Sequence, residues 1–128
     1  MRKLLVLATL VVAMLGVLTP SAQAAKPVPP SCTVTATDTS VGQDGTEYTV
    51  TWSFFDLRRG QTANGNLDGI MRFGPLEGVN GANPSGSHVV SAGSPGDHAA
   101  DGIITNRRDV VLATCGPVLF TVNSPPAA

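Results

Sequence analysis

Asp97, His98 and Asp101 form a local group that combines an acid, a base and metal-ligating capacity, and His88 lies ten residues before His98. Carboxylates and imidazoles in one place can perform general acid–base catalysis or hold a metal ion. Either role would also need a third strong ligand or an aimed nucleophile, and the neighbouring serines lie in no recognisable nucleophile motif. A solvated turn over 94–97 explains the same residues. We therefore assign no catalytic residue, and a hydrolase that uses this loop is the weakest of three functional hypotheses.

Asn64, Asn66 and Asp68 carry oxygen atoms at alternate positions and are followed by Gly69, which resembles the start of an EF-hand calcium loop. Position twelve of such a loop supplies a bidentate glutamate, but here it is Pro75. A single carboxylate provides too little charge to dehydrate a calcium ion. We expect a turn rich in Asn and Gly, without strong metal binding, and we predict no cofactor.

Two dibasic pairs, Arg58-Arg59 and Arg107-Arg108, hold four of the six positive charges that follow residue 24. Brought together, these arginines could bind a carboxylate or a phosphate through paired hydrogen bonds. Apart, they are solvated loop residues that keep strand ends from associating. The sequence alone favours the second interpretation.

The chain has two cysteines, Cys32 and Cys115, near opposite ends of the part that follows residue 24. In an oxidising compartment such a pair usually forms a disulfide. A redox role would normally need a close Cys-x-x-Cys pair, which is missing. We predict one structural disulfide between them.

The first residues have the build of a secretory signal peptide. Arg2 and Lys3 precede an apolar run over 4–18, Pro20 follows, and Ala22-Gln23-Ala24 forms a small-x-small cleavage site. The apolar run is shorter than the roughly 20 residues that a membrane-spanning helix needs. We expect residues 1–24 to be removed, leaving a secreted, extracellular protein without a stable membrane anchor.

The remaining residues divide into a proline-rich extended leader (25–31), a single β domain (32–123) and a short Pro/Ala tail (124–128). The full chain carries a net charge of −1, and removal of Arg2 and Lys3 leaves −3. Nucleic acids and anionic membranes both require clustered positive charge, and Lys26 is the one lysine left. These two classes of partner are therefore not expected.

Strand periodicity dominates the domain. Cys32 to Thr37 alternates small apolar residues with threonine, and Tyr48, Val50, Trp52 and Phe54 alternate with hydroxyl residues, so this aromatic face should lie at the centre of the core. Further short strands are predicted at 69–73, 88–92, 102–105, 109–114 and 118–122. Loops are predicted over 74–87 and 93–101, and a break between the last two strands at 115–117. The fold class is all-β: a small antiparallel sandwich or barrel of six or seven short strands, closed by one disulfide.

The order Cys32, Trp52, Cys115 is loosely similar to that of an immunoglobulin domain, in which a tryptophan packs on a disulfide between two sheets. The resemblance covers three residues, and Ala113 stands where such a domain has a tyrosine. It implies an architecture and assigns no functional residue.

Without a catalytic motif or a cofactor fingerprint, the chain has little with which to perform chemistry. Our first hypothesis is a secreted, non-enzymatic binding protein whose Gly-, Asn- and Ser-rich loops contact an unidentified extracellular protein or glycan. The alternative is a proteinaceous inhibitor of a secreted hydrolase, in which a rigid loop enters a cleft at low entropic cost.

Overall fold

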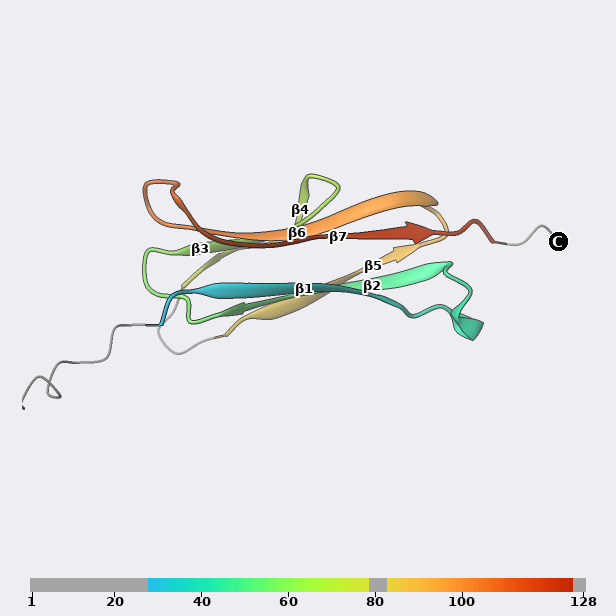
Figure 1. Cartoon of the computed structure of the whole chain (residues 1–128), viewed down its shortest axis with the longest axis horizontal. Helices are drawn as coiled ribbons and strands as arrows, with labels where there is room; N and C mark the ends of the chain where they lie inside the picture. Colours follow the sequence, from blue (N-terminus) through green and yellow to red (C-terminus); the bar gives the residue numbers. More distant parts are fainter. Residues whose placement is uncertain (1–27, 79–82, 126–128) are drawn as a thin grey trace, which may run out of the picture.

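The computed structural model describes residues 28–78 and 83–125 (Figure 1). The predicted signal peptide, residues 25–27 of the leader and residues 126–128 of the tail lie outside these ranges. Within them, no helix is long and apolar enough to cross a membrane. The elements are one 3-10 helix, η2 (Val41–Gln43), and seven strands: β1 (Ser31–Asp38), β2 (Glu47–Phe55), β3 (Thr62–Leu67), β4 (Ile70–Glu77), β5 (Ser85–Ser91), β6 (Gly96–Thr105) and β7 (Val111–Val122).

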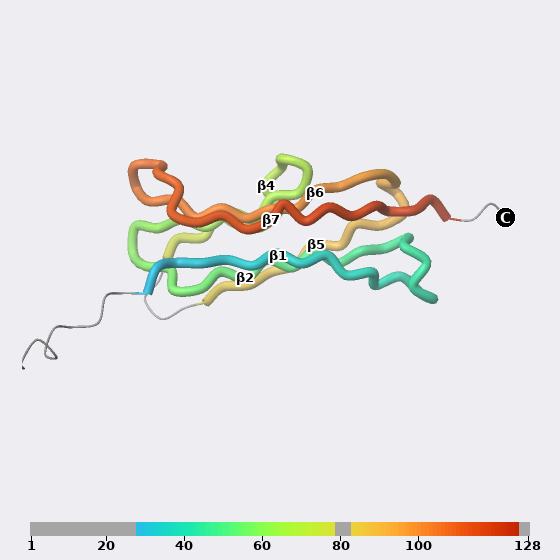
Figure 2. The backbone as a smooth tube through the Cα atoms, viewed as in Figure 1, coloured from blue at the N-terminus to red at the C-terminus, as the bar shows by residue number. Residues whose placement is uncertain are grey.

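The strands form two antiparallel sheets, which confirms the prediction of an all-β fold. One sheet has three strands in the order β1-β2-β5, and the other has four in the order β4-β3-β6-β7. Figure 1 shows the two sheets as layers, one above the other, with their strands along the long axis of the molecule. The first and last described residues lie at opposite ends of that axis (Figure 2).

The buried core lies between the layers, and its largest members come from β2. Val50, Trp52 and Phe54 are fully buried, whereas the residues between them are half-buried. This alternation follows from the pleat, which points successive side chains to opposite faces of a strand. The predicted aromatic face is confirmed as part of the core, which also contains Val34, Leu57, Ala63, Leu67, Val90, Ala100, Ile104, Phe120 and Val122.

The predicted turn over 64–69 is wrong for most of its length, because Asn64 to Leu67 belong to strand β3 and only Asp68 and Gly69 form the turn. The inward positions of β3 include Ala63 and Gly65, which are fully covered but carry little side chain. Glycine is needed at position 65 because the Trp52 ring of the opposite sheet occupies the space. Burial of β3 therefore depends on a bulky partner in another strand.

The predicted loop over 93–101 is also largely wrong, since β6 begins at Gly96 and pairs with both β3 and β7. The predicted break at 115–117 is not a break either. Strand β7 continues through Gly116 and Pro117, and the ladder with β6 shifts its register between Ala100 and Gly102. An irregularity of this kind admits a proline that cannot donate to the ladder.

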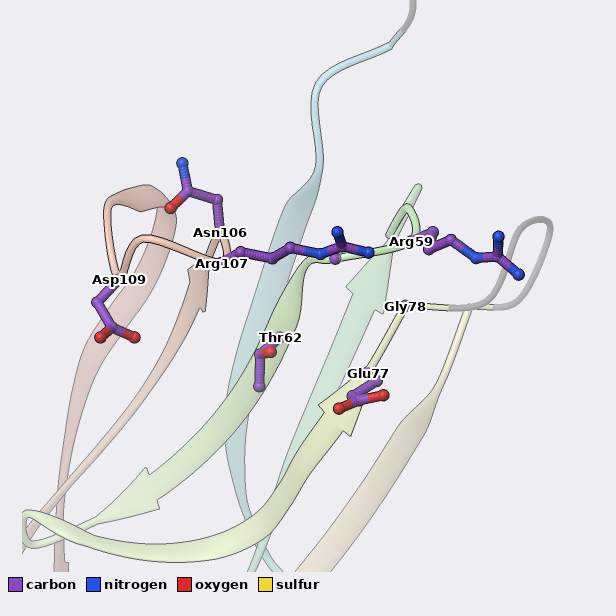
Figure 3. A pocket seen from close by; sticks show the side chains of 8 residues that line it. Arg59, Thr62, Glu77, Gly78, Asn106, Arg107 and Asp109 are labelled. Atoms are coloured by element: carbon purple, nitrogen blue, oxygen red, sulfur yellow. The ribbon is translucent and has the colours of Figure 1, made fainter.

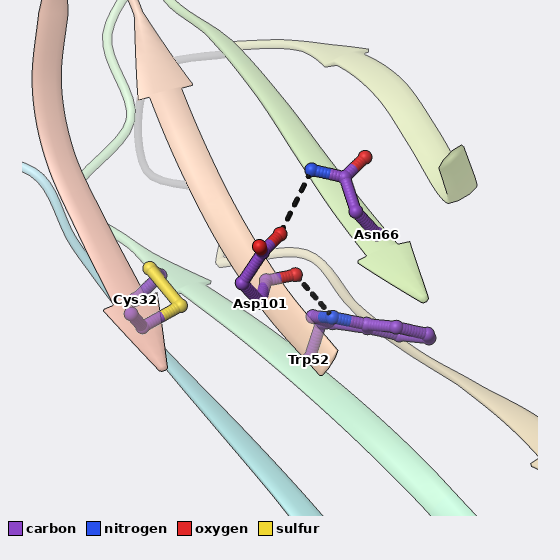
Figure 4. The surroundings of a disulfide bond; sticks show 5 residues. Cys32, Trp52, Asn66 and Asp101 are labelled. Carbon is purple, nitrogen blue, oxygen red and sulfur yellow. Dashed lines mark hydrogen bonds between the residues drawn. A yellow bond between two sulfur atoms is a disulfide. The ribbon is translucent and has the colours of Figure 1, made fainter. Parts of the chain in front are cut away.

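The predicted disulfide between Cys32 and Cys115 is confirmed. It joins β1 to β7 and thus connects the two sheets, and Figure 2 shows these two strands running side by side. A Cβ at Gly102 would lie 2.6 Å from the Cys115 sulfur, so β6 passes close behind the bridge. Figure 4 shows the bridge near Trp52, whose indole donates a 2.8 Å hydrogen bond to the Asp101 carbonyl oxygen.

Candidate anion-binding site

Three chain segments that are distant in sequence meet at one end of the four-stranded sheet. Thr62, at the start of β3, pairs with Glu77 at the end of β4 and with Thr105 at the end of β6. The β2–β3 and β6–β7 connections therefore emerge next to each other. These connections carry Arg58-Arg59 and Arg107-Arg108, respectively.

The β2–β3 connection is a closed turn. The Gln61 amide N–H donates to the Arg58 carbonyl oxygen over 3.0 Å, and the Gln61 side-chain oxygen accepts the Arg58 N–H over 2.8 Å. Gly60 supplies the left-handed backbone that the turn requires, with φ of 86°. The turn fixes the backbone beneath Arg59, whose side chain is exposed.

The β6–β7 connection is held in a similar way by an amide side chain. The Asn106 side-chain oxygen accepts the N–H groups of Arg108 and Val110 over 2.8 and 3.0 Å. The Asp109 N–H donates to the Asn106 carbonyl oxygen over 3.0 Å. Arg107 and Arg108 are exposed on this fixed backbone.

Between the two turns lies an open cleft of about 490 Å³, seen in Figure 3. The Arg107 side chain extends from its own turn across to the other one, where a Cβ on Gly60 would lie 2.7 Å from its Nε. Arg108 joins Arg59 and Arg107 in an adjoining hollow. The cleft is lined by polar and charged residues and glycine: Arg59, Gly60, Thr62, Glu77, Gly78, Asn106, Arg107 and Asp109.

The charges in the cleft are not paired with one another. In the part of the chain that the structure describes, one ion pair has its nitrogen and oxygen within 4.0 Å, and it joins His98 to Asp68 elsewhere in the molecule. Within the described ranges, the guanidinium groups of Arg59 and Arg107 are therefore in no ion pair. A guanidinium presents its hydrogen-bond donors in a planar fork that matches a carboxylate or a phosphate.

His98 is built into the fold rather than into a catalytic group. Its Nδ1 lies 2.6 Å from the Asp68 carboxylate and its Nε2 lies 2.7 Å from the Ser94 carbonyl oxygen, while its ring stacks on Phe120 with 5.4 Å between centroids. Both oxygens can only accept a hydrogen bond. A neutral imidazole can donate to one of them, whereas a protonated imidazole donates to both.

The electrostatics of this pair favour its charged form. Burial disfavours the imidazolium, but the hydrogen bonds to Asp68 and Ser94 and the nearby negative charges outweigh it and raise the pKa of His98. Burial likewise opposes ionisation of Asp68, yet the hydrogen bonds from His98 and Ala99 keep its pKa below the usual value. The His98 contribution to stability is complete below about pH 6.5 and is lost above it. The Asp68 contribution is lost only as the pH falls below about 4.

The other members of the predicted acid–base group point elsewhere. Asp97 and Asp101 lie on the opposite face of β6 from His98, because odd and even positions of a strand face opposite sides. Asp97 accepts a 2.7 Å hydrogen bond from Thr121. His88 lies on β5 in the other sheet. The structure does not bring these four side chains to one point.

The three predicted weak metal ligands are also engaged separately. The Asn66 side-chain nitrogen donates to Asp101 over 3.0 Å (Figure 4), and Asp68 accepts the Ala99 N–H as well as His98. Asn64 is the exception, because its buried side-chain oxygen has no hydrogen-bond partner among residues 28–78 and 83–125. Among the described residues no three histidine, cysteine or acidic side chains gather as a metal site.

The cleft thus adds Thr62, Glu77, Asn106 and Asp109 to the arginines that the sequence singled out. Of these four, Asn106 could have been noticed in the sequence, because it directly precedes a dibasic pair, whereas nothing in the sequence indicates Thr62, Glu77 or Asp109. Comparisons with known proteins found no matching family model, curated protein or solved structure.

Proposed function

We propose that this protein is a secreted, non-enzymatic binding domain that recognises a carboxylate-bearing ligand in the cleft between its two arginine turns. The observation that carries the proposal is that Arg59 and Arg107, from dibasic pairs far apart in the sequence, line one hollow. Each guanidinium is exposed and free of ion pairs among the described residues. Binding at this site therefore need not break an existing ion pair.

The rigidity of both turns supports a binding role. Gln61 and Asn106 hold the backbones that carry the arginines, so little backbone entropy is lost when a ligand binds. Export is supported by the signal-peptide pattern of residues 1–24 and by the Cys32–Cys115 bridge, which persists in oxidising compartments. Sequencing the amino terminus of protein from the culture medium tests export, with Ala25 expected as the first residue.

We further propose an immunoglobulin-like sandwich for the fold. The three- and four-stranded antiparallel sheets and the Trp52 side chain between them support this architecture. The bridge joins the first and last strands, β1 and β7, in place of the two inner strands that it joins in antibody domains. The proposal concerns architecture and carries no function with it.

The binding proposal is tested with the oxidised mature chain and a panel of carboxylated and neutral polymers immobilised on a sensor surface. We expect carboxylated polymers to be retained and their binding to weaken as salt is raised. The double variant Arg59→Gln/Arg107→Gln should lose this binding. Arg72→Gln, which removes an exposed arginine on β4 outside the cleft, is the matched control and should retain it. Equal binding by both variants would contradict the proposal.

A second candidate is an inhibitor of a secreted hydrolase, because the β2–β3 turn presents an exposed Arg59 on a backbone closed by two hydrogen bonds. This role predicts stoichiometric loss of activity of an arginine-directed protease. Arg59→Gln should abolish that inhibition, and Arg107→Gln should leave it intact. Cleavage of the turn without inhibition would rule this candidate out.

A further inference from the structure

We infer that the carboxylate-bearing ligand of this cleft is a sugar acid, a unit that presents a carboxylate beside several hydroxyl groups. The inference rests on the proposed binding function and concerns the class of ligand. It comes from the whole set of groups around the cleft, since two carboxylates, Glu77 and Asp109, share the walls with Arg59 and Arg107.

The mixture of charges disfavours a ligand that is only anionic. A phosphate or a polyglutamate would find partners in Arg59 and Arg107 but would be repelled by Glu77 and Asp109. A carboxylate accepts hydrogen bonds and cannot donate them when ionised. A ligand that brings hydrogen-bond donors for the acidic walls as well as an anion for the guanidinium groups matches both kinds of charge, and a sugar acid provides both.

The neutral groups that line the cleft also suit a sugar acid. The Thr62 hydroxyl both donates and accepts, and Asn106 uses its side-chain oxygen within the turn, which leaves its side-chain nitrogen as a donor. No lining residue is aromatic or a large aliphatic one. A peptide would leave its side chains without an apolar contact, whereas a hydroxylated ring needs none. A neutral sugar would leave both guanidinium groups unmatched.

Oligogalacturonate is the test probe, compared by titration calorimetry with the same oligomer after reduction of its carboxylates to alcohols and with polyglutamate of similar charge. We expect oligogalacturonate to bind at least about tenfold more tightly than either comparator, since a hydrogen bond to a charged group contributes about 1.5–3 kcal/mol. Arg107→Gln should weaken its binding about tenfold or more, and Arg72→Gln should leave the dissociation constant unchanged.

Glu77→Gln separates this inference from the proposed function. If Glu77 accepts a sugar hydroxyl, the variant should bind oligogalacturonate several-fold more weakly and polyglutamate more tightly, because it removes both an acceptor and a repelling charge. If polyglutamate binds as tightly as oligogalacturonate, or if Glu77→Gln strengthens both, the sugar-acid inference is wrong while a carboxylate site remains. If neither polymer binds and Arg107→Gln changes nothing, both the sugar-acid inference and the proposed function are wrong.

Discussion

Gly65→Ala is expected to destabilise the fold, although a single methyl group on a strand would ordinarily be harmless. A Cβ at Gly65 would lie 2.6 and 2.7 Å from the Cδ2 and Cγ atoms of Trp52. The indole is fully buried, and its Nε1 donates to the Asp101 carbonyl oxygen, so the ring cannot retreat without losing that hydrogen bond. The methyl group therefore has no room.

The magnitude follows from three effects. Overpacking a core costs about 1–3 kcal/mol, and weakening the indole hydrogen bond adds about 1 kcal/mol. Replacing glycine by alanine recovers about 0.4–1 kcal/mol by restricting the unfolded chain. The net loss is about 2 kcal/mol, which for a domain of this size lowers Tm by roughly 8–16 °C.

Thermal unfolding followed by circular dichroism measures this loss. Gly93→Ala is the matched control, because the nearest atom to its added Cβ is Ser91 Oγ at 3.8 Å, and its Tm should stay close to that of the wild type. Gly65→Ala should lower Tm by clearly less in a Trp52→Leu background, because the smaller leucine side chain can turn away from the added methyl group. Identical Tm values for Gly65→Ala and Gly93→Ala would refute the packing described between β3 and Trp52.

Three further outcomes are expected. Reduction of the Cys32–Cys115 bridge, which spans 83 positions, should lower Tm markedly, since closing such a loop stabilises a fold by up to about 4.5 kcal/mol; unchanged melting in dithiothreitol would contradict this. Tm should be higher at pH 5.5 than at pH 8, and His98→Gln should remove that difference if the His98–Asp68 pair causes it. Trp52 fluorescence should resist acrylamide quenching until the protein unfolds, and equal quenching in both states would place the ring at the surface.

The sequence predicted β1 and β2 because apolar residues alternate regularly with hydroxyl residues along both strands. Tyr48 to Phe54 reveals its period because every second residue is a bulky apolar one, so a local pattern is enough to identify the buried face. Strand β3 could not be found in this way, since its inward side includes Ala63 and Gly65. Gly65 is small because the Trp52 ring lies against it, and this complementarity exists only once the sheets have packed.

The predicted acid–base group shows that closeness in sequence does not ensure closeness of side chains in the fold. Asp97, His98 and Asp101 are close in sequence, but on a strand the first two point to opposite faces. His98 finds its carboxylate in Asp68, thirty residues away, across the ladder between β3 and β6. Side chains that are close in sequence can converge on one point in a loop, but on a strand they alternate between its two faces. The acid–base group was therefore predicted wrongly because β6 was predicted to be a loop.

The arginine cleft could be predicted in part from the sequence, and the topology explains why the two dibasic pairs lie close together. Two dibasic pairs on unrelated loops have no reason to meet, but β3 lies between β4 and β6, so the turns before β3 and after β6 must emerge at the same end. An amide residue lies near each pair, Gln61 two residues after one and Asn106 directly before the other, and each accepts an arginine backbone N–H through its side-chain oxygen. Both arginine pairs therefore stand on hydrogen-bonded turns at the same end of the four-stranded sheet.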